Sequence, residues 1–158
     1  MQLKSKRPGG IRAVYFAIAI SGFCALGAEV VWTRILSLML GPTVYTFSII
    51  LGVFLVGLGL GSWGGSHIAH EKGNPRLWLG VSQVLLCVTT AVSAYLLADY
   101  LPYWAGNVNS TAGPWKDFQG DILRTLLAVL PGAVLWGASF PLALASGAVG
   151  DEDPARLV

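Results

Sequence analysis

Charged residues are scarce in this sequence. Only 11% of its 158 residues are Asp, Glu, Lys or Arg, against about 25% in ordinary soluble domains. So few charges cannot cover the surface of a soluble globule of this size, and that class is excluded. The formal net charge of +2 is also too small for the basic footprint of a nucleic-acid-binding protein. We therefore expect no nucleic-acid partner.

Cysteine and histidine are rare as well. The two cysteines, Cys24 and Cys87, cannot form the framework of a disulfide-stapled fold and show no haem or redox motif. His67 and His70 stand three residues apart and share one face of a helix, but a zinc site needs a third and usually a fourth ligand. We expect no metal and no cofactor, and we interpret both histidines as residues of a membrane interface.

Apolar residues are abundant: they make up 54% of the chain, and the mean hydropathy is +0.66. This composition excludes intrinsic disorder. A helix needs about 20 apolar residues to cross a bilayer, and no run alternates in polarity as barrel strands do. The sequence predicts an all-α integral membrane protein, one transmembrane domain over 1–158, with two helical hairpins. Its four spans are expected at about 13–40, 44–68, 77–98 and 122–148.

Turn-forming residues separate these spans. Gly41 and Pro42 predict a tight turn between the first two. The longer connection over 99–120 is rich in turn formers and holds Trp104 and Trp115. Because such rings favour the headgroup layer, we expect a periplasmic loop along one membrane face. A solvated loop with incidental aromatic residues is the alternative.

Basic residues predict the orientation. An even number of spans puts both chain ends and the second connection on one side, and most of the Lys and Arg residues fall there. The positive-inside rule then places both termini in the cytoplasm, with the chain as a multi-pass membrane protein. These basic residues are Lys4, Lys6, Arg7, Arg12, Lys72, Arg76 and Arg156.

The second span carries a ridge of small residues, and the fourth carries two prolines. Gly57, Gly61 and Gly65 recur at four-residue spacing, which allows another helix backbone to approach closely. The ridge leaves open whether that helix belongs to this chain or to another subunit. Pro131 and Pro141 are expected to kink the fourth span, as packing features rather than as a transport site.

Glu29 stands inside an apolar run, where a charge costs roughly 2.5–3.5 kcal/mol on insertion scales. Arg34 lies five residues on, about 140° around the helix, which is poor geometry for a direct bond. Arg124 is the other possible partner, since both residues fall toward the outer ends of their spans. We expect an interhelical ion pair from Glu29 to Arg124 or Arg34. A cation-binding or proton-linked carboxylate is the alternative.

Three stretches resemble a known family. They are Gly22 to Leu36, with the string Glu-Val-Val-Trp-Thr-Arg at 29–34; Gly41 to Ser48 with Leu58 to Ser62; and Leu130-Pro131 with Trp136 to Pro141. Together they are similar to the membrane-embedded spermidine-synthase-like proteins of bacteria, described as fusions of a major-facilitator-like part with a spermidine synthase.

This resemblance implies a module of the bacterial inner membrane that normally precedes a soluble aminopropyltransferase domain. No position here matches that domain, so no catalytic residue is carried over and the chain alone is expected not to be an enzyme. We expect a module that lies in the lipid bilayer and anchors or assembles a protein partner through its glycine ridge. Two alternatives remain: a polyamine-type transport unit with Glu29 as its cation-binding carboxylate, and the membrane half of a split polyamine-synthesising enzyme.

The major-facilitator loop pattern Gly-x-x-x-Asp-Arg-x-Gly weakens the transport alternative. It would fall at 66–73, where only Gly73 matches.

Overall fold

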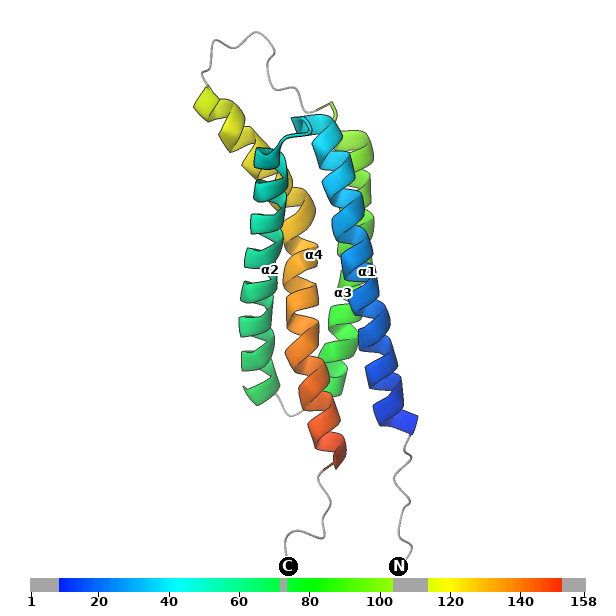
Figure 1. Cartoon of the computed structure of the whole chain (residues 1–158). Coiled ribbons are helices and arrows are strands. Elements are labelled where there is room, and N and C mark those ends of the chain that lie inside the picture. The colour runs from blue at the N-terminus through cyan, green and yellow to red at the C-terminus, as the bar shows by residue number, and fades with distance from the viewer. Residues whose placement is uncertain (1–8, 72–73, 104–113, 152–158) are drawn as a thin grey trace, which may run out of the picture.

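The computed structural model describes residues 9–71, 74–103 and 114–151, and every regular element in this part of the chain is helical (Figure 1). Four of the helices are long and apolar enough to cross a membrane. The predicted all-helical class and the presence of four long apolar helices are therefore confirmed, and their passage through a membrane stays a prediction. The elements are α1 (Gly9–Leu40), α2 (Val44–Glu71), α3 (Pro75–Tyr95), the π-helical turn η1 (Leu96–Tyr100) and α4 (Pro114–Asp151).

The turn between α1 and α2 follows from three consecutive residues. Gly41 adopts a φ of +96°, a left-handed conformation that costs glycine nothing. Thr43 then caps α2, because its Oγ1 accepts a hydrogen bond from the backbone N–H of Thr46 at 3.2 Å. The chain thus reverses direction within three residues, as Gly41 and Pro42 predict.

The predicted loop over 99–120 is wrong in part, because η1 extends to Tyr100 and α4 already begins at Pro114. Proline at a first helical position is favourable, since its missing N–H would have no partner there. A helix can also continue beyond the hydrocarbon core of the membrane. Polar residues there lower the mean hydropathy of the segment without ending the helix. Trp115 and Phe118 pack on one another in this extension, with ring centroids 5.3 Å apart. Trp104 lies outside the described residues.

Helix α4 is the centre of the bundle. Half of its apolar window is buried, against 6% of the corresponding window of α1, and α4 packs on α2, α3 and α1. Pro131 and Pro141 lie inside α4, yet the helix is unbroken from Pro114 to Asp151. The missing proline N–H groups therefore do not divide this helix into separate segments.

Consecutive long helices run in opposite directions. Figure 1 shows that α2 and α4 run the same way, while α1 and α3 run in the opposite direction. The first turn of α1 and the last turn of α4 lie at the same end of the bundle. That agrees with an even number of spans, and the side of the membrane on which this end lies stays a prediction.

Candidate functional site

The glycine ridge of α2 lies against α4 of the same chain. A Cβ atom added to Gly57 would come 2.5 Å from the Cβ of Ala133, and one added to Gly65 would come 2.7 Å from the Cα of Ala138. At Gly61 it would overlap the backbone carbonyl of Val134. Such separations are shorter than carbon atoms tolerate, so the lack of a side chain is what lets the two backbones approach.

α4 contributes a glycine of its own to this contact. A Cβ atom on Gly137 would overlap the backbone carbonyl group of Leu58 on α2. The sequence left the partner of the ridge open, and the structure places it within this chain. Gly57, Gly61 and Gly65 are therefore covered by α4 and are not a free surface for a separate subunit.

Side-chain hydrogen bonds join α3 to α4. The hydroxyl of Ser93 donates to the carbonyl oxygen of Ala128 at 2.7 Å. The amide Nε2 of Gln83 donates to Oγ of Ser139 at 3.1 Å, and the Ser139 hydroxyl in turn donates to the carbonyl oxygen of Leu135 at 2.8 Å. Hydrocarbon offers no water partners, so these bonds satisfy polar groups that would otherwise be unpaired.

The indole of Trp136 lies where α1 and α4 meet. It packs on Trp32 of α1, with ring centroids 5.5 Å apart and planes tilted by 57°. Gly132 makes room for this contact, because a Cβ atom there would come 2.9 Å from Cη2 of Trp32. Trp136 is only 7% exposed, and its Nε1 has no hydrogen-bond partner in the described part of the chain.

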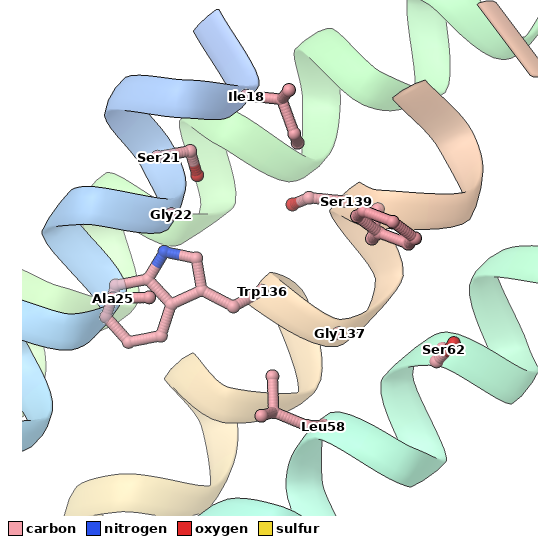
Figure 2. A pocket seen from close by; sticks show the side chains of 10 residues that line it. Ile18, Ser21, Gly22, Ala25, Leu58, Ser62, Trp136, Gly137 and Ser139 are labelled. Carbon is pink, nitrogen blue, oxygen red and sulfur yellow. The ribbon is translucent and has the colours of Figure 1, made fainter. Parts of the chain in front are cut away.

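Two cavities adjoin Trp136. The smaller, of about 450 Å³, lies among α1, α2 and α4, and the larger, of about 600 Å³, lies among α1, α3 and α4. Both are lined by Ser21 and Trp136. Figure 2 shows the smaller cavity, with the indole nitrogen of Trp136 on the edge of the ring turned toward Ser21. This region combines open space with an unpaired donor.

The charged residues singled out from the sequence do not come together as predicted. Glu29 is half-buried on α1, and Arg34 is exposed. Arg124 of α4 places Nη1 3.6 Å from Oδ1 of Asp121, one turn away on its own helix. Among the described residues, no ion pair joins Glu29 to either arginine. Asp121 supplies Arg124 with a carboxylate from the same helix.

The predicted interface residues lie at the surface of the bundle. His67 and His70 are both exposed on the last two turns of α2. The ring of His67 stacks on Trp63, with centroids 6.2 Å apart and planes inclined by 7°. At the opposite end of the bundle, Trp115 is exposed. Within the described ranges no group of three or more His, Cys, Asp and Glu side chains forms a metal-binding arrangement.

Gln83, Ser93 and Ser139 were not predicted from the sequence as site residues. Each is a polar residue inside an apolar span, and polar groups in spans turn toward protein rather than lipid. That rule was an available signal for all three. No comparable signal exists for Trp136, because a buried indole donor usually has a hydrogen-bond partner and only the packing shows that this one lacks it.

Comparison with known proteins gives a partial likeness. A stretch of 59 residues is 41% identical to a polyamine aminopropyltransferase of Leptospira interrogans. The stretch is 37% of this chain and 12% of that relative, so the chain corresponds to a small part of its length. This match supports a spermidine-synthase-like relationship over part of the chain. No family model and no solved structure matches.

Proposed function

We propose that this chain is a non-catalytic membrane module that holds an aminopropyltransferase subunit or domain at the bilayer. The observation that carries the proposal is the partial match to a polyamine aminopropyltransferase in a chain whose described part consists of four membrane-length helices. A likeness in a stretch that is only 12% of a longer enzyme fits a module that accompanies catalysis rather than performing it.

The packing of the bundle is consistent with such a role. The glycine ridge of α2 packs against α4 of the same chain. The ridge is therefore not available to a partner subunit. Any partner in the membrane must then meet an outer face that carries large apolar side chains. Phe16 and Phe23 on α1 and Trp63 on α2 are examples, each more than two-thirds exposed.

Capture of the tagged chain from its native cells tests this proposal. Membranes are dissolved in a mild detergent, the chain is captured, and the eluate is assayed for aminopropyl transfer from decarboxylated S-adenosylmethionine to putrescine. We expect activity to be enriched in the eluate. An unrelated four-span protein with the same tag is the control. Activity that stays entirely in the unbound fraction would contradict the proposal.

The cavities do not favour polyamine transport. Among the described residues that line the two cavities at Trp136, none is charged, and a buried cation needs paired carboxylates. Glu29 is not one of these lining residues. Uptake of labelled putrescine into proteoliposomes that is abolished by Glu29→Gln would support transport instead, and absence of uptake would agree with the anchoring role.

A further inference from the structure

We propose that the two cavities at Trp136 bind a neutral, largely apolar molecule through a carbonyl oxygen that accepts a hydrogen bond from the indole Nε1–H. The inference is independent of the anchoring role. It rests on the unpaired donor, on the space beside it, on the depth of the donor in the membrane and on the absence of charge in the described lining.

The hydrogen-bond donor is the indole nitrogen of Trp136. Nε1 of Trp136 is the buried side-chain nitrogen or oxygen without a hydrogen-bond partner in the described part of the chain. An unpaired donor is costly in any interior, and more so in hydrocarbon, where water does not compensate it. Figure 2 shows the nitrogen on the ring edge that faces Ser21 across the smaller cavity. Nε1 itself exposes almost no surface, so an acceptor in the cavity satisfies the donor after a small shift of the side chains that cover it.

The space is large enough for a ligand. Each cavity, of about 450 Å³ and about 600 Å³, falls within the range of about 300–1,000 Å³ that is usual for small-molecule sites. The walls are mainly apolar, with a few uncharged polar groups. Ser21, Ser62 and Ser139 line the smaller cavity, and Ser21, Gln83 and Thr90 line the larger. An apolar lining with a small number of polar groups is typical of sites for apolar ligands.

The depth of this donor selects among apolar molecules. Trp136 stands about four residues beyond the midpoint of the span Phe118–Gly147, which is about 5 Å along the helix. The ester groups of bilayer phospholipids lie at the edge of the hydrocarbon, about 15 Å from its centre. A phospholipid ester therefore lies too far from Trp136 to accept this hydrogen bond. The carbonyl group belongs instead to a molecule without a charged headgroup, such as a ketone or quinone with an apolar tail, which can lie wholly within the hydrocarbon core.

The lining excludes a charged ligand. The described residues around both cavities include no Asp, Glu, Lys, Arg or His. Because an unpaired ion in such surroundings is strongly disfavoured, the site rejects polyamine cations and free carboxylates. It accepts a molecule with one uncharged polar group.

The two cysteines provide a reporter for occupancy. Cys24 of α1 and Cys87 of α3 are free thiols that line the larger cavity, which shares Ser21 and Trp136 with the smaller one. We infer that the apolar tail of a molecule bonded to Nε1 extends into the larger cavity and covers them. The full chain in detergent micelles is alkylated with N-ethylmaleimide in the presence of undecanophenone, a ketone with a ten-carbon tail, or of undecylbenzene. These two probes differ only by a carbonyl in place of a methylene group. We expect undecanophenone to slow alkylation at a lower concentration than undecylbenzene.

Trp136→Phe keeps the aromatic ring and removes the donor. Loss of one neutral hydrogen bond predicts about 2- to 10-fold weaker protection by undecanophenone, with protection by undecylbenzene unchanged. Trp63→Phe, at an exposed position of α2, is the matched control and leaves both unchanged. Equal protection of the wild-type chain by the two probes would overturn the proposal, because any lipid tail would then fill the space. Protection by putrescine would overturn it as well. The comparison of probes on the wild-type chain holds even if Trp136→Phe fails to fold.

Discussion

Gly61 of α2 rests on the backbone carbonyl group of Val134 of α4, so closely that a methyl group at position 61 would overlap it. Seventy-odd residues separate the two in the sequence, and α3 returns between them in the opposite direction (Figure 1). The contact therefore depends on the whole order of the spans. Lipid gives no hydrophobic drive for helix association, so close approach of this kind is what holds the bundle together.

Gly61→Ala should destabilise the bundle. The new methyl group meets backbone rather than a flexible side chain, so α2 and α4 must separate, at a cost of about 1–3 kcal/mol by analogy with overpacked cores. Unfolding by dodecyl sulfate in mixed micelles, followed by circular dichroism, measures the change. Gly59→Ala is the matched control, because nothing lies within 4 Å of a Cβ atom there. Equal effects of the two substitutions would show that α2 and α4 do not meet along this ridge.

Ser93→Ala should weaken the attachment of α3. It removes the 2.7 Å hydrogen bond to the carbonyl oxygen of Ala128, and interhelical bonds in membranes contribute about 0.6 kcal/mol on average, up to about 1.7. The same unfolding assay applies. Ser48→Ala serves as control, since the Ser48 hydroxyl bonds only within α2, to the carbonyl oxygen of Val44. A loss of stability no larger than that of the control would refute the interhelical role.

The ion pair of Arg124 differs between the sequence-based prediction and the structure, and the difference can be measured. A double-mutant cycle on Asp121 and Arg124 should yield a coupling of about 0.2–1 kcal/mol, as for partly exposed pairs. A cycle on Glu29 and Arg124 should yield a coupling near zero, because the described structure forms no ion pair between them. A Glu29–Arg124 coupling larger than that of Asp121 with Arg124 would restore the interhelical pair that the sequence suggested.

Local chemistry made much of the fold predictable. Gly41 and Pro42 predicted the first turn, whereas α3 begins at Pro75, two residues before the predicted start of the third span at 77. The first turns of α4 were missed because hydropathy indicates which residues lie in the hydrocarbon core and does not indicate where a helix begins. The π-helical turn, in which the N–H of Leu101 bonds to the carbonyl oxygen of Leu96 at 2.7 Å, has no signature in the sequence.

The candidate site was less predictable, because it depends on which helices become neighbours. A glycine ridge predicts a close contact with another helix but does not identify that helix. Ala133 and Gly137 stand four residues apart on α4, and matching this pair to the ridge would have suggested α4 as that partner. The unpaired nitrogen of Trp136 follows only from the packing of α1 against α4, which no spacing rule gives.

The central prediction is that the four helices cross the membrane with both chain termini on the cytoplasmic side. A chain with Cys24 and Cys87 replaced by alanine carries a single new cysteine, either Thr43→Cys in the first turn or Asn74→Cys in the second; both positions are exposed. A membrane-impermeant maleimide is then applied to spheroplasts and to inside-out vesicles. We predict that Thr43→Cys reacts only in spheroplasts and Asn74→Cys only in inside-out vesicles. Labelling of both positions from the same face would contradict the account.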